Sequence, residues 1–570
     1  MNNKIILGIH DGHNCGASIS IGPKIIASVS EERLTRKKND VGFPEKAILE
    51  VLKISGVTSS QLSYVAYASL FMHSKNHLQD IYEWYNVGES DQKRDNNISN
   101  DYKKQIFKVR RDERIESVKR LLGIEEQKIR FVEHHVAHLA AAYYLSPFKK
   151  KPILGITCDG AGDGLSATVN ICDNNKIKRI CEISRHSSIG KIYSRVTYLM
   201  GLRPWQDEYK VMGLAPYADK TKVTEQSKKL FNLLNIDHDE IAFKLQTGLS
   251  TNYCYEYLKK SFENVRFDVI AGAVQYFTEQ MLVKWIKNCI NRTKIRDVVC
   301  GGGVFMNVKS NMLLGEISSV NSIFFMPTSS DESISMGACL YLYYSENNIN
   351  NNGESAIENL YLGAEFDKKC EENELKNNNV TEFSEVIETN NTNKYILEIL
   401  KNDGIIGLCR GKMEWGARAL GNRSIITDPS NFNKINILNS QIKSRDFWMP
   451  FAPAIIDDDT KYIFDNKKKI CTRFMASAFK IKEEQKSIFS SASHPKDGTI
   501  RPQTVSEKSN KNFYDLLKKY KKSSGRSGVL NTSFNLHGEP IVYSPKDAIN
   551  VFKRSGLKSL ALNNFILKKK

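Results

Sequence analysis

The sequence predicts a mixed α/β protein of more than one domain. Short apolar runs rich in β-formers, such as residues 4–9 and 152–157, are bounded by Gly, Asp and Ser and indicate buried strands. Longer stretches such as residues 269–290 carry apolar residues at three- and four-residue spacing, which is typical of helices. Strands that alternate with helices indicate a mixed or parallel sheet. At 570 residues, the chain is too long for one ordinary core.

Two segments of the N-terminal half resemble each other. Residues 6–19 (ILGIHDGHNCGASI) and 153–169 (ILGITCDGAGDGLSATV) each contain an apolar strand, an acidic Gly-rich turn and a strand of small residues. This favours a duplicated domain whose halves face each other across a cleft. A chance similarity of two β-hairpins explains the pattern equally well.

An Asn-rich polar segment without periodicity, residues 345–355, reads as a linker. Apolar strands resume after it, for example at residues 404–409. We therefore expect a domain at 1–345, a linker at 346–360 and a second α/β domain at 361–570.

Composition narrows the class of protein. Hydrophobic residues make up 41% and charged residues 26%, as in globular proteins. No basic segment followed by an apolar stretch opens the chain, and no apolar run approaches the roughly 20 residues of a membrane helix. We expect a cytoplasmic protein without a membrane partner.

The formal net charge of +18 suggests nucleic-acid binding. However, Lys and Arg are spread along the chain and often alternate with acidic residues, as at 480–486. A solvated surface with basic pockets for phosphorylated ligands is the better interpretation, and no nucleic-acid partner is expected.

The segment HHVAH at 134–138 is a candidate metal site. On a helix, His134 and His138 share one face, and this spacing suits two imidazole ligands of one divalent metal. Ordinary core or surface histidines are the alternative. Further ligands are available in Asp159 or Asp163 and in Asp331. Two imidazoles with carboxylates favour Fe(II), Mn(II) or Zn(II).

Three consecutive glycines, Gly301, Gly302 and Gly303, follow a predicted strand in CGGGVFMN. Without side chains, they allow backbone N–H groups to approach a phosphate or nucleotide closely. The segment is neither a P-loop nor the GxGxxG pattern, which argues against a Walker-type NTPase and a Rossmann dehydrogenase.

The C-terminal half carries four basic patches punctuated by Gly or Pro. Guanidinium groups bind phosphate in a bidentate manner, so the patches predict a pocket for phosphorylated ligands. Any one patch alone would more often be a solvated surface. The candidate residues for binding phosphorylated ligands in this half are Arg418, Arg423, Ser424, Lys443, Arg445, Arg501, Asn531, Ser533 and Asn535.

Taken together, the motifs resemble those of the O-carbamoyltransferases that modify nodulation factors, cephalosporins and aminoglycosides. They occur in the family's order from the N-terminus to about residue 550. The matching segments are HDGHNCGAS (10–18), EERLTRKKND (31–40), HHVAH, CDGAGDG, YKVMGLAPY (209–217), CGGGVFMN, the Asp331 segment, GARALGNRSI, RPQTV and LNTSFN. The resemblance implies an actin-like (ASKHA) N-terminal domain and a YrdC-like C-terminal domain.

The resemblance also implies a two-step reaction. In the C-terminal domain, carbamoyl phosphate and ATP, with Mg²⁺, give carbamoyladenylate and pyrophosphate. In the N-terminal domain, the carbamoyl group passes to a hydroxyl of a small-molecule natural product or sugar at a divalent metal, Fe(II) being favoured over Mn or Zn. The implied metal ligands are His134, His138, Asp159 and Asp331.

Other roles follow from the same resemblance. His13, beside Asp11, is the candidate general base, and Lys210, with Glu208, lines the same cleft. The adenylate would be cradled by Gly301, Gly302, Gly303 and Asn307.

Two positions depart from the family pattern. Met449 stands where Arg is usual, which puts one phosphate contact in doubt, and Asp446 stands where Glu is usual. Two other functions compete: a tRNA threonylcarbamoyladenosine-type modification enzyme, which the basic charge favours, and a non-catalytic actin-like regulator that binds nucleotide. A homodimer is plausible, and no motif indicates the acceptor.

Overall fold

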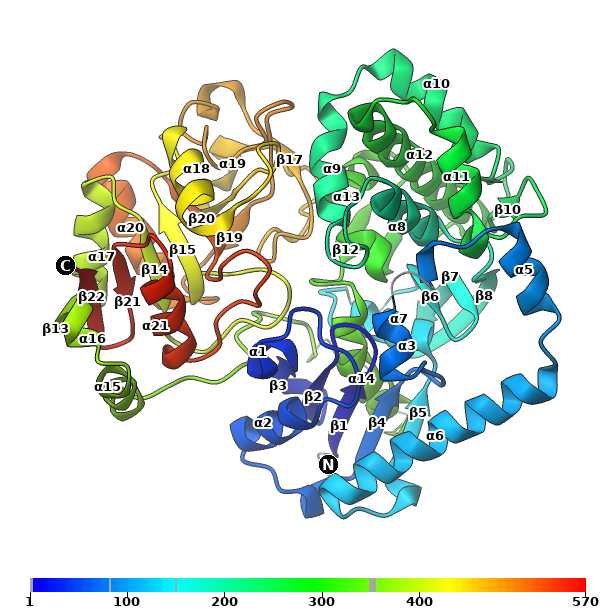
Figure 1. Ribbon diagram of the computed structural model, residues 1–570, viewed down its shortest axis with the longest axis horizontal. Helices are drawn as coiled ribbons and strands as arrows, with labels where there is room; N and C mark the ends of the chain where they lie inside the picture. Colours follow the sequence, from blue (N-terminus) through cyan, green and yellow to red (C-terminus); the bar gives the residue numbers. More distant parts are fainter. Residues whose placement is uncertain (1–3, 81–83, 149–150, 348–354) are drawn as a thin grey trace. The chain divides into compact units, whose positions relative to one another are not determined.

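The computed structural model describes residues 4–80, 84–148, 151–347 and 355–570 (Figure 1). Residues 348–354 of the predicted linker lie outside these ranges. The chain divides into two compact units. Unit 1 comprises Met1–Glu31, Asn39–Ile357 and Lys468–Ile470, and unit 2 comprises Glu32–Lys38, Glu358–Lys467 and Cys471–Lys570.

The first sheet of unit 1 has the strand order β3-β2-β1-β4-β5 in the described part of the chain. Strands β1 to β3 form an antiparallel meander, and β4 and β5 extend it in parallel. The strands are β1 (Ile5–His10), β2 (Gly16–Ile21), β3 (Lys24–Ser30), β4 (Tyr64–Ala68) and β5 (Ile129–Val132).

The second sheet of unit 1 repeats this arrangement as β8-β7-β6-β11-β12, again with an antiparallel meander followed by two parallel strands. The two similar sequence segments form the corresponding hairpins β1–β2 and β6–β7, so the predicted duplication is visible in the topology. The strands are β6 (Ile153–Gly162), β7 (Leu165–Asp173), β8 (Lys176–Ser184), β11 (Asp297–Gly301) and β12 (Ser322–Phe325).

Helices α7 (His134–Tyr144) and α14 (Ile334–Asn347) join the two halves of unit 1. Helix α7 packs on β6 and β11, α14 packs on β1, β2 and β4, and the two helices pack against each other. Their backbones come so close that a Cβ atom at Gly337 would lie 1.8 Å from the carbonyl oxygen of Ala137. Similarly, a Cβ atom at Gly8 would lie 2.0 Å from the carbonyl oxygen of Ser335.

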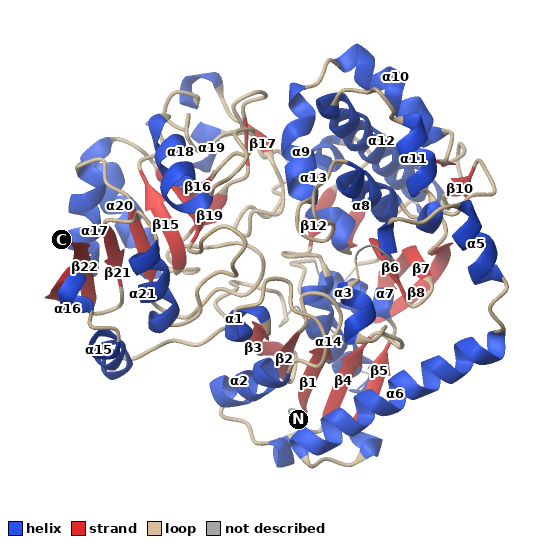
Figure 2. Ribbon diagram, viewed as in Figure 1, coloured by secondary structure: helices blue, strands red, loops and turns tan. Residues whose placement is uncertain are grey.

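Further helices of unit 1 surround these sheets (Figure 2). Among the described helices, none combines the length and apolar character needed to cross a membrane. Those used below are α6 (Asn100–Leu122), α8 (Ile189–Leu199), α9 (Glu208–Leu214), α12 (Phe267–Thr293) and α13 (Val308–Glu316).

Unit 2 is built on a mixed sheet with the described order β13-β22-β21-β14-β15-β20-β16-β19. Helices α17 (Thr392–Lys401) and α20 (Lys511–Ser524) pack together, and buried residues such as Ile396, Phe513 and Leu517 share one core with strand residues. The strands are β13 (Ser384–Glu388), β14 (Ile406–Cys409), β15 (Arg423–Thr427), β16 (Ala452–Ile456), β19 (Gln503–Val505), β20 (Gly528–Ser533), β21 (Ser559–Ala561) and β22 (Phe565–Lys569).

The close approach of α7 and α14 leads to a test. We expect Gly337→Val to lower the thermal unfolding midpoint by at least about 5 °C, because the added side chain collides with backbone that cannot move without separating the two helices. Gly248→Val is the control, since no atom lies within 4 Å of a Cβ atom placed there. Equal unfolding midpoints of the two variants in differential scanning calorimetry would contradict this packing.

Candidate metal centre and anion site

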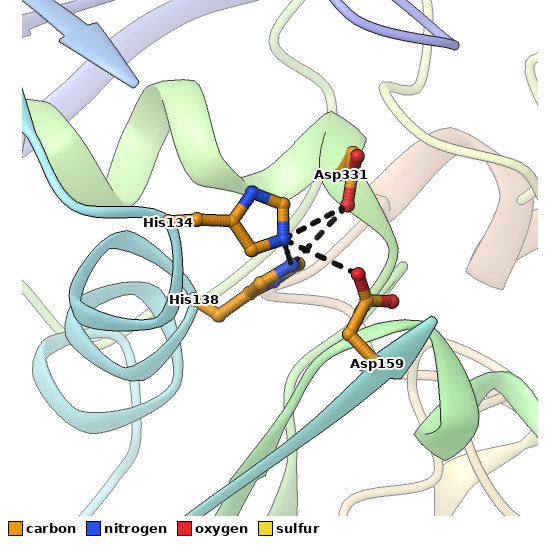
Figure 3. Close-up of side chains that lie close together, drawn as sticks. All are labelled: His134, His138, Asp159 and Asp331. Carbon is orange, nitrogen blue, oxygen red and sulfur yellow. Dashed lines mark hydrogen bonds and ion pairs between the residues drawn. The ribbon is translucent and has the colours of Figure 1, made fainter. Parts of the chain in front are cut away.

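Four buried ligand atoms converge in unit 1, from His134, His138, Asp159 and Asp331, and all lie within 4.8 Å of one another. The two Nε2 atoms of the histidines are 3.1 Å apart. Asp159 Oδ2 lies 3.2 Å from His134 Nε2, and Asp331 Oδ1 lies 3.2 Å from His138 Nε2 (Figure 3). Two imidazole nitrogens and two carboxylate oxygens that face one point form a donor set for a divalent metal.

Secondary structure explains this convergence. His134 is the first residue of α7 and His138 lies one turn later, so both point to the same side (Figure 3). Asp159 lies near the end of β6, and Asp331 begins the 3₁₀ turn Asp331–Ser333 that leads into α14. A Cβ atom at Gly162 would lie 2.1 Å from the His134 ring, so only glycine lets β6 come this close.

Polar groups around the centre fix the orientation of His134. Its Nδ1 lies 2.9 Å from Ser69 Oγ. Asp163 accepts hydrogen bonds from the backbone N–H groups of His134, Leu70 and Phe71 at 2.8, 2.8 and 3.0 Å. Such outer partners orient metal-binding imidazoles. Of the two aspartates that the sequence left open as ligands, Asp159 reaches the centre, whereas Asp163 holds the backbone beside it.

The electrostatics of the centre favour a positive charge. Burial lowers the pKa of His134, but Asp331 and Asp159 outweigh burial and raise it to about 10. Burial raises the pKa of Asp331, but His13 and His134 hold it well below its usual range. Since a buried carboxylate pair without a cation is costly, a bound divalent metal fits these residues.

Asp331 connects the centre to His13. Its Oδ1 faces the ligand histidines, while its Oδ2 lies 3.3 Å from His13 Nδ1 and 3.8 Å from His10 Nε2. The His13 ring, which is partly exposed, stacks on Trp205 with 5.2 Å between ring centroids. A carboxylate at Nδ1 leaves the opposite ring nitrogen to accept a proton from a substrate.

Both carboxylate oxygens of Asp11, which lies near the candidate base His13 in the sequence, accept hydrogen bonds. Arg114 of α6 donates to both its oxygens, at 2.9 and 2.8 Å, and Tyr67 donates to one of them at 2.9 Å. Burial raises the pKa of Asp11, but Arg114 outweighs burial and lowers it. These bonds fix the loop after β1 to β4 and α6. Asp11 is therefore better placed to position this loop than to transfer a proton.

Lys210 lies on α9, where its ammonium is 3.4 Å from Asp207. Glu208, at the start of the same helix, accepts a hydrogen bond from the Trp205 backbone at 2.7 Å. Burial raises the pKa of Glu208 to about 7. Residues 205–210 therefore contact His13 through one side chain, the indole of Trp205.

The three glycines after β11 allow close approach of the protein's own backbone. A Cβ atom at Gly302 would lie 2.3 Å from the Cys158 carbonyl oxygen, and one at Gly301 would lie 2.7 Å from that of His138. Gly303 N–H donates to Asp159 Oδ1 at 2.9 Å. Asn307 caps α13 through Ser310 N–H. Gly301 and Gly303 thus pack against two candidate metal ligands, His138 and Asp159. That these glycines and Asn307 bind an adenylate stays a prediction.

His135, between the two ligand histidines, belongs to the core. It is buried, and its Nδ1 lies 2.8 Å from Thr157 Oγ1 on β6. Burial, then His134, lower its pKa to about 3.

A second charged site lies in unit 2 around Arg501. The Arg501 side chain is half-buried, and its Nε is buried without a hydrogen-bond partner among the described residues. Burial first, then Arg418 and Arg445, lower its pKa well below the usual range. Arg445 also lies over the Phe451 ring, 4.9 Å from the centroid. Arg418, Arg445 and Arg501, which we call the arginine cluster, therefore form a candidate site for an anion.

Arg423 and Ser424, also predicted to bind phosphate, make hydrogen bonds within unit 2. Arg423 donates to the carbonyl oxygens of Tyr543, Arg410, Gly411 and Asn422. Ser424 Oγ accepts from Gly421 N–H at 2.9 Å. These two residues therefore stabilise the backbone around β15.

Lys443 sits among oxygen atoms of β20 and the following loop. Its ammonium donates to Ser533 and Asn535, including Asn535 Oδ1 at 2.8 Å. Burial, then Arg445 and Lys38, lower its pKa well below the usual range. This places Lys443, Ser533 and Asn535 at the arginine cluster, together with Lys38 from the N-terminal segment.

Asn531 links β20 to the loop that carries Arg418. It donates to Ala419 O at 3.2 Å and to Gln503 Oε1 at 2.8 Å. Met449, the departure from the family pattern, is buried, and its N–H donates to Asp446 O at 3.0 Å.

Several functional neighbours were missed by the sequence analysis. Glu414 accepts from the backbone N–H groups of Leu420, Asn422 and Arg423 and so folds the loop around Arg418. Ser69 and Arg114 support the metal centre from loops and helices without motifs. Lys38 could have been found, because it lies in the segment EERLTRKKND.

Comparisons with known proteins identify relatives of this chain. The chain is 33% identical to "Uncharacterized protein MJ1051" of Methanocaldococcus jannaschii, over 99% of this chain and 100% of that protein. It is 27% identical to "Nodulation protein NolNO" of Sinorhizobium fredii, over 99% of this chain and 79% of that protein. It is 23% identical to the 3'-hydroxymethylcephem-O-carbamoyltransferase of Amycolatopsis lactamdurans, over 46% of this chain and 47% of that protein.

Two family models cover most of the sequence. The model "Carbamoyltransferase N-terminus" matches residues 5–340, which hold the whole metal centre. The model "Carbamoyltransferase C-terminus" matches residues 397–569, which hold the arginine cluster. The chain therefore belongs to the carbamoyltransferase family and is an enzyme that transfers carbamoyl groups.

Proposed function

We propose that the protein is an ATP-dependent O-carbamoyltransferase that activates carbamoyl phosphate in unit 2 and delivers the carbamoyl group to a small-molecule hydroxyl in unit 1. The observation that carries this proposal is the convergence of His134, His138, Asp159 and Asp331 beside His13, whose Nδ1 faces Asp331. The repeated strand order of unit 1 supports an actin-like fold for that unit. A YrdC-like fold for unit 2 rests on the sequence resemblance.

The activation step requires that several anions meet. Carbamoyl phosphate and water give carbamate and phosphate; a carbamate oxygen then attacks the α-phosphorus of ATP, and pyrophosphate leaves with Mg²⁺. Arg418, Arg445 and Arg501 neutralise the reacting phosphates and align them. Burial and the two neighbouring arginines lower the pKa of Arg501, and an anion would relieve that repulsion, which supports this role.

In the transfer step, the acceptor oxygen attacks the carbamoyl carbon and AMP leaves. His13 takes the acceptor's proton at Nε2, while Asp331 Oδ2 holds Nδ1 and stabilises the imidazolium that forms. Asp11, bound by Arg114 and Tyr67, fixes the loop that presents His13.

The residues His134, His138, Asp159 and Asp331 would hold the divalent metal, with Fe(II) favoured over Mn(II) and Zn(II). When bound, the metal supplies Lewis-acid polarisation of the carbamoyl group. Ser69 and Asp163 keep His134 in the orientation that this binding needs. The backbone of Gly303 does the same for Asp159.

The metal centre is tested with His138→Ala. We expect bound metal to fall to background and carbamoyl transfer to fall at least about 100-fold, because one of four ligands is lost. Carbamoyl-phosphate-dependent ATP–pyrophosphate exchange should persist. Metal analysis and both assays are compared with His135→Ala, which removes a buried neighbour that faces Thr157. Equal loss of transfer and exchange in His138→Ala would argue against two separate sites.

The anion site is tested with Arg501→Met. We expect exchange to fall at least about 100-fold, because a donor to the reacting phosphates is lost. The unfolding midpoint should not fall, since the variant removes a half-buried cation that lacks a carboxylate partner.

The control for this variant is Arg473→Met, which removes the same charge from a guanidinium that donates to Glu358 O. Metal content should be unchanged in both variants. Exchange at the unaltered rate in Arg501→Met would remove the anion site from the proposal. Exchange that needs no carbamoyl phosphate, together with modification of tRNA, would favour the RNA-modifying alternative.

A further inference from the structure

A cluster of cations and aromatic rings adjoins the metal centre within unit 1. We call it the Trp84 cluster, and it consists of His73, His77, Trp84, Arg185 and Lys191. The Trp84 ring lies 4.9 Å from each of the two histidine rings, measured between centroids. The ammonium of Lys191 lies 5.2 Å from the centroid of the Trp84 ring. A flat indole with a cation at its face can hold a ligand that has an apolar face and a charge.

The cluster reaches the metal centre through α8. Ser188, the N-cap of this helix, donates to the carbonyl oxygens of Asp159 and Gly160 at 3.2 and 2.7 Å. Lys191 lies in the first turn, and its Cε is 3.9 Å from the position of a Cβ atom at Gly160. The lysine stem therefore passes directly beside the strand end that carries the ligand Asp159.

The cluster also reaches the proposed base. The Trp84 ring lies 6.1 Å from the Trp205 ring, which stacks on His13 at 5.2 Å. A molecule held against Trp84 would thus lie near Trp205, which stacks on His13, and near Lys191, which passes beside Gly160 at the strand end that carries Asp159.

Among the described residues, no carboxylate forms an ion pair with Lys191, so its positive charge is not balanced. Lys191 is only 8% exposed, and within the described residues its ammonium makes no hydrogen bond or ion pair. Burial first, then Arg195 and Arg185, lower its pKa to about 7. The carboxylates that oppose these effects are Asp159 and Asp331, both of which belong to the metal centre.

The surroundings of His73 show the same imbalance. Burial first, then His77, Arg185 and Lys191, lower its pKa to about 3. Arg110 acts in the same direction, although it pairs with Glu113 on its own helix. Nearby Asp163 is already engaged by three backbone N–H groups.

Arg195 adds a second buried cation one turn after Lys191. It donates to the carbonyl oxygen of Trp84 at 3.1 Å and to that of Asn252. Its Nε and Nη1 are buried and have no hydrogen-bond partner in the part of the chain that the structure describes. Among the described residues, these two cations of α8 therefore have no anionic partner.

We propose that the acceptor is an anionic hydroxyl compound, a sugar or polyol that carries a carboxylate or a phosphate, and that its negative group binds Lys191 and Arg185 while its apolar face packs on Trp84. This identification of the acceptor class rests on the proposed function. An anion compensates buried cations through charge-assisted hydrogen bonds, whereas a cationic amino sugar adds to the repulsion. Lys191 and Arg185 then determine specificity and take no part in the chemistry.

The test uses four matched probes: methyl glucoside, glucuronic acid, glucose 6-phosphate and glucosamine. Their binding to the metal-loaded full-length protein is measured by isothermal titration calorimetry. We expect at least one anionic probe to bind roughly tenfold or more tightly than methyl glucoside, the gain of one charge-assisted contact, and glucosamine to bind more weakly than methyl glucoside. Glucuronic acid and glucose 6-phosphate distinguish a carboxylate from a phosphate as the recognised group.

Variants test whether Lys191 and Arg185 cause the preference for an anionic probe. Lys191→Met should bring the affinity for the anionic probe down to that for methyl glucoside, and Arg185→Gln should reduce the preference at an exposed position that does not disturb the core. The control is Lys178→Met, which removes the same charge from an exposed position on β8 and should keep the preference. Equal affinities for all probes, tighter binding of the neutral or cationic probe, or no binding of any probe overturns the proposal. So does an anion preference that survives both Lys191→Met and Arg185→Gln.

ATP–pyrophosphate exchange on the same preparation separates this inference from the proposed function. Exchange that depends on carbamoyl phosphate, without an anion preference, overturns the acceptor class alone. An anion preference without exchange overturns the activation scheme and supports the chemistry of the pocket.

Discussion

Two carboxylates buried beside two imidazoles need a positive charge among them to compensate for their lost solvation. In the interior of unit 1, imidazole nitrogens and carboxylate oxygens lie 3.2–3.6 Å apart, close enough to share one bound cation. Much of unit 1 is arranged around this constraint. Gly337 lets α14 approach α7, Gly162 makes room for the His134 ring, and Gly302 brings β11 against β6.

A charge imbalance of the opposite sign marks the other two candidate sites. Arg501 lies near Arg418 and Arg445, and the buried Lys191 lies near Arg185 and Arg195. Among the described residues, no carboxylate forms an ion pair with Arg501 or Lys191. On this basis we propose a metal at the centre, phosphates at Arg501 and an anionic acceptor at Lys191.

Much of the fold and part of the site could be predicted from the sequence, because they depend on local spacing. The period of an α-helix alone places His134 and His138 on one side, and the repeated hairpins indicated the duplication. Residue spacing alone left Asp159 and Asp163 both open as ligands, because the choice depends on where β6 ends relative to α7, and only the family resemblance pointed to Asp159. The two aspartates are four residues apart, yet only the Asp159 carboxylate joins the histidine rings, while Asp163 holds the backbone of His134.

Sequence patterns also failed to show which polar groups are already satisfied. Arg423 and Arg501 look alike in a Gly- and Pro-punctuated basic patch, but four carbonyl oxygens surround Arg423, and the Arg501 Nε has no partner among the described residues. The glycines at 301–303 do allow a close approach, as predicted. What approaches Gly301 and Gly302, however, is the protein's own backbone at His138 and Cys158. Arg114 carries no motif, and only the tertiary fold brings it to Asp11.

The central claim is that the four converging residues bind a metal. Anomalous diffraction from crystals of the full-length protein, purified with its metal and recorded on both sides of the iron absorption edge, tests this claim most directly. The account predicts one strong peak at about 2.0–2.2 Å from His134 Nε2, His138 Nε2 and oxygens of Asp159 and Asp331. A peak ligated by other residues, or no peak at any first-row metal edge in catalytically active crystals, would contradict it.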